Sequence, residues 1–248
     1  MKISLIGYGR MGREIEALAG EKGIGIASKI DPSADKASHR KISKESLENT
    51  DVCIDFTQPD TVLKNLEAVA GLGKNIVIGT TGWYDKKKEA GEIVENAGIG
   101  CIYASNFSIG VNLFFRIVGN SAQLFNHFPE YDCFAVEEHH KMKKDSPSGT
   151  EETLGEILLE NLDKKKKIET GRLDRQIEES ELHFASVRGG SVPGTHSIKF
   201  DSEADTVELK HAARGRKGFA SGALKAAEWI NGKKGFYSID DMMEEIIK

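Results

Sequence analysis

The stretch Ile3–Gly12 reads ISLIGYGRMG, and it decides the fold of the first half of the chain. Its apolar run Ile3–Ile6 predicts a β-strand, and the helix-like pattern Met11–Lys22 follows. Between them lies a G-x-G-x-x-G sequence, whose glycines allow a tight turn and let backbone N–H groups approach a pyrophosphate at the helix start. A glycine-rich turn without a ligand is the alternative, and the flanking strand and helix argue against it. The loop residues expected to contact a dinucleotide are Gly7, Gly9, Arg10, Met11 and Gly12.

An acidic residue follows the second predicted strand, Ile24–Ile30. This residue, Asp31, stands about 20 positions after the glycine loop, where a carboxylate can accept hydrogen bonds from an adenosine ribose. Pro32 rather than an arginine comes next, and the nearest cations are Lys29 and Lys36. The sequence therefore predicts NADH or NADPH as the cofactor and favours NADH.

Short apolar runs alternate with helical patterns through the rest of the first half. Further strands are predicted at Val52–Phe56, Asn75–Ile78 and Ile99–Ala104, and helices at Asp60–Leu72 and Asp85–Asn96. Such alternation indicates βαβ units and a parallel sheet. The fold class predicted for this half is α/β, with a Rossmann-like parallel sheet.

Two loops follow the fourth and fifth predicted strands, at the sheet edge where ligands of parallel sheets collect. Their hydroxyl, amide and aromatic groups could position a nicotinamide ring. Ordinary turn chemistry is an equal alternative, because Gly, Thr and Asn are common turn residues. The residues concerned are Gly79, Thr80, Thr81, Ala104, Ser105, Asn106 and Phe107.

The pattern of elements changes after Ser108. Strands are predicted at Asp132–Glu137, Glu181–Arg188, Thr195–Asp201 and Thr206–His211, with one substantial helix at about Thr150–Leu162. This pattern is typical of a mixed or antiparallel sheet, and a C-terminal helix at Phe219–Trp229 could fold back onto the first domain. We therefore expect a dinucleotide-binding domain of residues 1–108 with 217–248, and a smaller α+β domain of residues 109–216.

The second half also contains the polar segment Glu137–Thr150, EEHHKMKKDSPSGT. Its two adjacent histidines follow a predicted strand, so an extended chain would point them to opposite sides. The segment ends at a predicted helix start, where free N–H groups favour a carboxylate or phosphate. Imidazole and ammonium groups nearby would bind an acidic small molecule and could donate a proton. The residues of this candidate site are His139, His140, Lys143, Ser148, Gly149 and Thr150.

Three other interpretations of this segment compete with a substrate site. Metal binding is disfavoured, because cationic side chains surround the histidines and would repel a metal ion. An ordinary capped helix would explain Ser148 or Thr150, and a solvated charged loop would explain the lysines and acids. Elsewhere in the second half, Arg188 could add a contact to a carboxylate, whereas His196 and His211 lie on predicted strands and are interpreted as structural.

Composition limits the classes of protein that the chain could belong to. The 248 residues carry a formal net charge of −5, so a nucleic-acid-binding protein is not expected. No apolar run reaches the roughly 20 residues of a membrane span, and the N-terminus does not read as a signal peptide. The wide spacing of Cys53, Cys101 and Cys133 indicates buried thiols rather than disulfides or zinc ligands, and Lys164–Lys167 is interpreted as solvated surface. We therefore expect a cytoplasmic, soluble protein.

Taken in order, these motifs resemble those of the dihydrodipicolinate reductase family, also called 4-hydroxy-tetrahydrodipicolinate reductases. The resemblance runs essentially from end to end, although Ser105 replaces a proline usual in the family and the glycine loop is one residue shorter than its common form. The motifs that carry it are GYGRMG at 7–12, IDFTQP at 54–59, VIGTTG at 77–82, ASNFSIGVN at 104–112, EEHHKMKKDSPSGT at 137–150, SVRGGSVPGTH at 186–196 and HAARGRKGFASGALKAAEWI at 211–230.

The resemblance implies an enzyme of the lysine and diaminopimelate pathway that reduces a cyclic dicarboxylate to tetrahydrodipicolinate with NADH or NADPH. It also implies a homotetramer formed through the second domain. The acid groups of the family fall on His139 and Lys143, and its carboxylate-binding residues on His140, Gly149 and Thr150. An NAD(P)H-sensing regulator without turnover, or a dehydrogenase for another imino or keto diacid, are the alternative functions.

Overall fold

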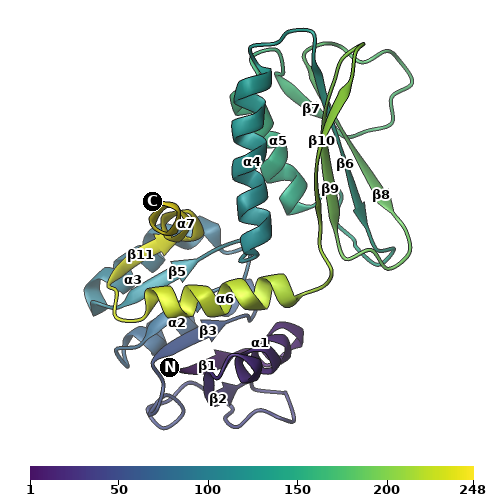
Figure 1. The fold of residues 1–248 in the computed structure, drawn as a ribbon. Coiled ribbons are helices and arrows are strands. Elements are labelled where there is room, and N and C mark those ends of the chain that lie inside the picture. Colours follow the sequence, from purple (N-terminus) through teal and green to yellow (C-terminus); the bar gives the residue numbers. More distant parts are fainter. The chain divides into compact units, whose positions relative to one another are not determined.

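The computed structural model describes residues 1–248 and divides the chain into two compact units. The first unit contains Met1–Ile109 and Arg216–Lys248, and the second contains Gly110–Gly215 (Figure 1). None of the helices combines the length and the apolar character that a membrane span requires.

The first unit contains a six-stranded sheet in which all neighbouring strands are parallel (Figure 1). The predicted Rossmann-like α/β fold is therefore confirmed. In order across the sheet, the strands are β11 (Gly235–Ser238), β5 (Gly100–Tyr103), β4 (Asn75–Ile78), β3 (Val52–Asp55), β1 (Lys2–Ile6) and β2 (Gly25–Ile30). The helices are α1 (Arg10–Glu21), α2 (Val62–Ala70), α3 (Lys87–Ala97), α6 (Lys217–Ile230) and α7 (Ile239–Ile247), with 3-10 turns η1 (Pro59–Thr61) and η2 (Tyr84–Lys86).

Helices cover both faces of this parallel sheet, which explains why its strands are apolar on both sides. Side chains alternate between the faces along each strand. On one face, Leu5 of β1 packs in the same core as Ile15 of α1. On the other face, the next residue, Ile6, packs in the same core as Leu66 of α2.

The C-terminal segment supplies the strand β11 at one edge of this sheet, beside β5. The side chain of Asn75, on β4, fixes its approach. Asn75 Nδ2 donates to the carbonyls of Ile230 and Lys233 at 2.7 and 3.1 Å, and its Oδ1 accepts the Gly100 N–H at 2.7 Å. One amide therefore ties the end of α6 to two central strands.

The second unit contains a five-stranded mixed sheet. In order, its strands are β10 (Thr206–Ala212), β9 (Thr195–Asp201), β6 (Asp132–His139), β8 (Glu181–Arg188) and β7 (Lys167–Glu169). The central strand β6 pairs antiparallel with β9 and parallel with β8, so the predicted mixed sheet is confirmed. The helices α4 (Ile109–Phe125) and α5 (Gly149–Asn161) cover one face, where Val118, Leu158 and Phe184 are fully buried (Figure 1).

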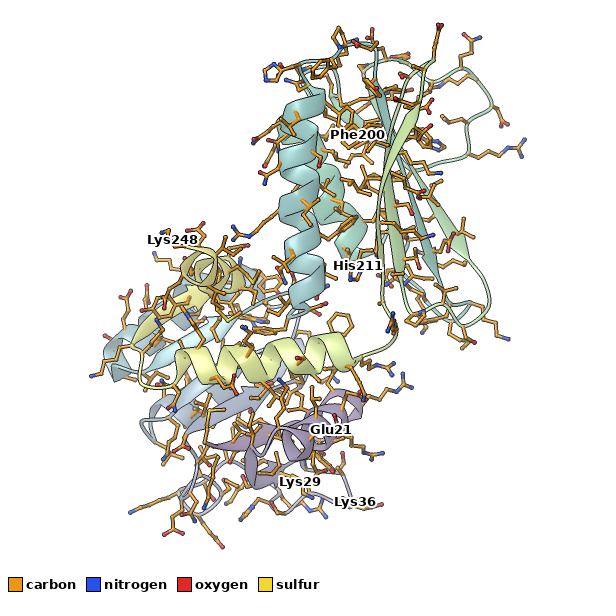
Figure 2. The ribbon with its side chains drawn as sticks, in the orientation of Figure 1. Glu21, Lys29, Lys36, Phe200, His211 and Lys248 are labelled. Carbon is orange, nitrogen blue, oxygen red and sulfur yellow. The ribbon has the colours of Figure 1, made fainter.

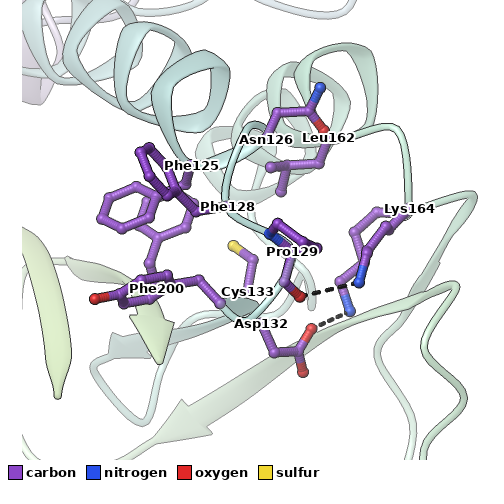
Figure 3. A pocket seen from close by; sticks show the side chains of 11 residues that line it. Phe125, Asn126, Phe128, Pro129, Asp132, Cys133, Leu162, Lys164 and Phe200 are labelled. Atoms are coloured by element: carbon purple, nitrogen blue, oxygen red, sulfur yellow. Dashed lines mark hydrogen bonds and ion pairs between the residues drawn. The ribbon is translucent and has the colours of Figure 1, made fainter. Parts of the chain in front are cut away.

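A small cavity of about 30 Å³ lies in the second unit, beside the stacked rings of Phe125 and Phe200 (Figure 3). The ring centroids of this pair are 4.2 Å apart, and Cys133 also lines the cavity. A space of this size has room for about one or two water molecules. The cavity is therefore a feature of the packing and not a site for a metabolite.

The lysine run Lys164–Lys167, interpreted from the sequence as solvated surface, contains one buried member. Lys165 is only 4% exposed. Its ammonium group donates to the carbonyls of Glu179 and Glu181 at 3.0 and 2.8 Å and pairs with Asp132 at 2.6 Å. The surface interpretation is wrong for Lys165, because a long side chain can bring its charge to acceptors that lie far away in the sequence.

Four elements were not predicted from the sequence. The largest is α4, whose segment Ile109–Phe125 mixes aromatic and β-branched residues with Gly110 and Gly119, all weak helix formers. Its helical form depends on the core of the second unit, where Phe114 and Val118 are buried. The other three elements are short: β7, β11 and α7.

Candidate functional site

A cavity of about 640 Å³ lies in the first unit beside the glycine loop. It receives residues from the ends of β1, β2 and β3, the edge where ligands of open parallel sheets bind. Three of the predicted cofactor residues line it, namely Gly7, Gly9 and Asp31. Other lining residues, which sequence reasoning did not select, include Arg40, Lys41, Thr57, Gln58 and Lys64.

The glycines at positions 7 and 9 of the loop have different structural explanations. Gly7 has a φ of +85°, and a Cβ there would lie 2.3 Å from the carbonyl oxygen of Phe56, so the fold itself requires glycine. At Gly9, by contrast, a Cβ would meet nothing within 4 Å, and φ is −83°. The protein alone has no need of glycine at this helix start, whereas the close approach of a pyrophosphate would require one.

The carboxylate of Asp31 joins the glycine loop to the loop after β2. Its Oδ2 accepts the Tyr8 N–H at 2.8 Å, and its Oδ1 accepts the N–H groups of Ser33 and Ala34 at 2.9 Å each. Burial alone would raise the pKa of Asp31, but the hydrogen bonds from Ser33, Tyr8 and Ala34 lower it. Asp31 is therefore ionised at neutral pH and retains acceptor capacity on Oδ2 toward the cavity.

Arg40 and Lys41 reach this cavity from a loop that no sequence signal linked to it. The Asp31 N–H donates to the His39 carbonyl at 3.0 Å, and this contact brings the loop back beside β2. Arg40 Nη1 then donates to the Ala34 carbonyl at 2.8 Å. Figure 2 labels Lys29 and Lys36, the cations nearest Asp31 in the sequence. Neither of them lines the cavity.

The loops after β4 and β5 contain residues of two kinds. The buried Thr80 hydroxyl donates to Asp55 at 3.1 Å and accepts the Thr57 N–H at 2.8 Å, so it joins two loops of the fold. Thr81 and Ser105 are exposed. None of the seven residues predicted to position a nicotinamide lines the cavity, and those with a packing role are Gly79, Thr80, Ala104 and Phe107.

In the second unit, β6 directs Glu137 and His139 to the same side of the sheet, two residues apart. Both are buried, with exposed fractions of 0% and 8%. His140 comes directly after the strand and is half-buried, and its N–H donates to the Val192 carbonyl at 2.8 Å. The expectation that the two histidines occupy different surroundings agrees with this geometry.

The carboxylate of Glu137, to which sequence reasoning gave no role, accepts hydrogen bonds from two elements, β8 and the start of α5. Its Oε1 accepts from the Arg188 guanidinium at 2.6 Å and from the Ser186 hydroxyl at 2.9 Å, both on β8. The Ser148 N–H, at the start of α5, lies 3.3 Å from each of its oxygens. Arg188, predicted as a possible ligand contact, thus has a carboxylate partner inside the protein.

A second buried carboxyl group, Glu151 in the first turn of α5, lies beside Glu137. It is 1% exposed, and the Ser186 hydroxyl reaches both carboxyls, with 3.1 Å to Glu151 Oε2. Burial and the neighbouring Glu137 raise the pKa of Glu151 to about 9. Burial would also raise the pKa of Glu137, but hydrogen bonds from Glu151, Ser148 and Arg188 lower it to about 2. At neutral pH the pair therefore holds one proton, on Glu151.

The imidazole of His139 lies against the carboxylate of Glu137, and the cations Lys143 and Arg188 are nearby. Its Nε2 is 3.3 Å from Glu137 Oε2, without the alignment of a hydrogen bond. Burial lowers the pKa of His139, and the charge of Glu137 opposes this effect, whereas Lys143 and Arg188 lower the pKa further. Lys143 is therefore close enough to influence His139, while its Nζ pairs with Asp145 at 2.7 Å.

The first turn of α5 has free backbone N–H groups that could hold an anion. The Ser148 side chain caps the helix by accepting the Glu151 N–H at 3.2 Å. The N–H groups of Gly149 and Thr150, at the first two positions, have no acceptor within the helix. A Cβ on Gly149 would meet nothing within 4 Å, as at Gly9, so this second helix start also has open space beside its amides.

Glu137, His139 and His196 could together supply three ligand atoms to a metal ion, since these atoms lie within 4.8 Å of one another. His196 faces Glu137 across the β6–β9 pair, and its ring centroid is 5.3 Å from that of His139. A cation there would compete with Arg188 for Glu137 and meet the charge of Lys143. These neighbours favour an anion nearby over a metal ion.

The proton on Glu151 predicts a specific pH dependence of stability. The pKa of Glu151 rises on folding from 4.5 to about 9, so the folded state keeps a proton that the unfolded chain releases, and stability falls as the pH rises between these values. Glu151→Gln keeps a hydrogen-bond donor but cannot lose a proton. Urea unfolding between pH 6 and 8.5 should show a less negative slope for this variant, by up to ~1.4 kcal/mol per pH unit.

Glu152→Gln, at the exposed neighbouring position, is the matched control and should keep the wild-type slope. If Glu151→Gln and Glu152→Gln gave the same slope as the wild type, Glu151 would not hold a proton in the folded state.

Comparisons with known proteins agree with the resemblance seen in the sequence. Residues 1–107 match the family described as dihydrodipicolinate reductase, N-terminus, and residues 110–243 match dihydrodipicolinate reductase, C-terminus. The 4-hydroxy-tetrahydrodipicolinate reductase of Christiangramia forsetii is 36% identical over 248 residues, which is 100% of both chains. That of Methanococcoides burtonii is 38% identical over 85% of this chain and 78% of its own.

A solved structure of similar fold is the dipicolinate-bound dihydrodipicolinate reductase from Paenisporosarcina sp. TG-14, with a TM-score of 0.78. The alignment covers 97% of this chain and 98% of that one, and at 22% identity it is evidence for the fold. The two family matches and the relatives above 30% identity decide the family itself: this chain belongs to the dihydrodipicolinate reductases.

Proposed function

We propose that the chain reduces 4-hydroxy-tetrahydrodipicolinate to tetrahydrodipicolinate with NADH or NADPH, a step of lysine and diaminopimelate biosynthesis. The observation that carries this proposal is the first turn of α5, where open space at Gly149 adjoins N–H groups that lack an acceptor within the helix. His139 and Lys143 stand on the preceding segment of the same unit. The related structure from Paenisporosarcina holds dipicolinate, a planar dicarboxylate, in keeping with an anion at such a site.

The residues of the first unit fit a dinucleotide. Gly9 leaves the space that a pyrophosphate needs, and Asp31 keeps acceptor capacity toward the cavity. A bound reduced nicotinamide would supply the hydride. The nicotinamide half would lie toward the exposed Thr81 and Ser105, at the ends of β4 and β5.

In the second unit we assign two tasks. The amides of Gly149 and Thr150, together with His140, would hold the substrate carboxylates and so fix the orientation of its ring. His139 and Lys143 would be the acid groups that favour protonation of the atom that gains a proton as the hydride arrives. The ammonium group of Lys143 would also attract the dicarboxylate.

The charged side chains that line the cavity bear on the choice between NADH and NADPH. From the sequence, NADH was favoured because no arginine follows Asp31. The cavity, however, is lined by Arg40, Lys41 and Lys64 and by the single acid Asp31. We propose that the enzyme accepts both cofactors, with the guanidinium of Arg40 available to a 2′-phosphate.

We further propose that the enzyme is a cytoplasmic homotetramer, as the family resemblance implies. One face of the mixed sheet is covered by α4 and α5, and no helix of the second unit covers the other (Figure 1). On that face Phe134 and Val136 are half-buried, and Val187 is 51% exposed. A sheet face that has no covering helix and exposes apolar side chains among polar ones is suited to pairing with another copy of the chain.

A coupled assay tests the proposed reaction. The purified protein should oxidise NADH or NADPH only when aspartate semialdehyde and pyruvate are condensed in the same tube. His139→Ala and Lys143→Ala should each lower kcat by roughly 100-fold, because acid assistance contributes about that much, while NADH binding measured by fluorescence stays unchanged.

Lys144→Ala and Glu138→Ala, at exposed neighbouring positions, are the matched controls and should retain turnover. Binding of NADH without any turnover would instead indicate a regulator. Turnover with other imino or keto diacids alone would indicate a different dehydrogenase.

A second variant tests the cofactor proposal. Arg40→Ala should raise the KM for NADPH by roughly 10- to 100-fold, because it removes a hydrogen bond between charged groups, and should leave the KM for NADH unchanged. Lys36→Ala, outside the cavity, should change neither value. An equal effect of Arg40→Ala on both cofactors would mean that Arg40 does not contact a 2′-phosphate.

A further inference from the structure

The carboxylate of Glu137 contacts both parts of the proposed substrate site, and the function proposed above gives it no task. We propose that Glu137 is a positioning residue that fixes the imidazole of His139 on one side and the anion-binding first turn of α5 on the other. The inference rests on the proposed function, in which these two parts protonate and bind the substrate. It assigns to Glu137 no contact with substrate or cofactor.

The contact with His139 sets the position of the imidazole proton. Nε2 of His139 lies 3.3 Å from Oε2 of Glu137, and the side chain of Glu137 is fully buried. An ionised carboxylate only accepts hydrogen bonds, so an unprotonated Nε2 would turn its lone pair toward a negative charge. The carboxylate therefore favours a proton on Nε2 in the neutral ring, and the Pro193 carbonyl, which accepts a hydrogen bond from this ring, favours the cation.

The contact with α5 acts on the other part of the site. The Ser148 N–H is 3.3 Å from both oxygens of Glu137, and the Ser148 side chain caps the helix. The amides assigned to the substrate carboxylates, those of Gly149 and Thr150, follow directly in the chain. One carboxylate thus holds the proposed acid and the proposed anion site at a fixed distance from each other. This matters because catalysis is sensitive to displacements of about 1 Å.

Every charged or titratable group around Glu137 favours its ionised form. Arg188 on β8 donates to it at 2.6 Å. Glu151 on α5 lies beside it, and burial and the charge of Glu137 raise the pKa of Glu151 to about 9. The negative charge of Glu137 also favours the cationic forms of His139, on β6, and His196, on β9. Lys143 adds positive charge beside His139.

A carboxylate that served only the stability of the second unit would have a different signature. Its neutral amide replacement would lower the free energy of unfolding but would not change the titration of His139. A positioning residue changes that titration, because its charge favours the cationic imidazole. The state of His139 is therefore the discriminating measurement, and it requires no turnover.

The experiment uses the full-length protein with histidine rings labelled with nitrogen-15. The chain has 7 histidines, and the spectrum of His139→Gln identifies the resonances of His139 by their loss. In the wild type, neutral His139 should carry its proton on Nε2. In Glu137→Gln, its titration should move to lower pH, whereas Glu138→Gln, on the exposed side of β6, should leave it unchanged.

The same variants are then compared in turnover and in dipicolinate binding. Glu137→Gln should lower kcat by roughly tenfold or more and weaken dipicolinate binding, with NADH affinity unchanged. An unchanged titration of His139 together with wild-type kcat in Glu137→Gln would overturn the proposal. A neutral wild-type His139 with its proton on Nδ1 would also overturn it, and this result does not depend on whether the variant folds. If the wild-type protein did not catalyse the reductase reaction, only the proposed function would be overturned.

Discussion

The second unit depends on one buried charge, the carboxylate of Glu137. A buried ion is costly unless it is paired and hydrogen-bonded, and here donors come from β8 and from the start of α5. Removing any of these donors would leave the charge less well compensated. The carboxylate therefore joins β6, β8 and α5, and in the inference above its separate contact with His139 positions the imidazole.

The first unit uses two carboxylates in a similar way at the ends of its strands. Asp31 fixes the glycine loop through the Tyr8 N–H, and Asp55 accepts from Thr57, Thr80 and Asn65 between neighbouring loops. Each ordered loop then presents backbone N–H groups at a helix start. Gly9 and Gly149 share one property: a Cβ would meet nothing at either position, so neither glycine is explained by packing. In the proposed function, each of these glycines lets an anionic ligand approach the backbone closely.

Local patterns predicted the two sheets and the glycine loop, because strand alternation and the glycine spacing are visible within about ten residues. The family, predicted from motifs in order, is confirmed by the comparisons. Sequence reasoning missed α4, whose weak helix formers depend on tertiary packing, and the burial of Lys165. It also missed Arg40 in the cavity and the coupling of Glu137 to Glu151, since both depend on contacts between distant segments. The roles assigned to His139, Lys143 and the cofactor residues stay predictions.

The central claim is that the open space at the start of α5 exists for the carboxylates of the substrate. Calorimetric titration of dipicolinate into Gly149→Ala tests it most directly, with Gly20→Ala as the control, a helical glycine whose added Cβ also meets nothing within 4 Å. We expect Gly149→Ala to keep the wild-type Tm and NADH affinity but to bind dipicolinate at least about tenfold more weakly, a loss of ~1.4 kcal/mol. Wild-type dipicolinate affinity in Gly149→Ala would contradict the account.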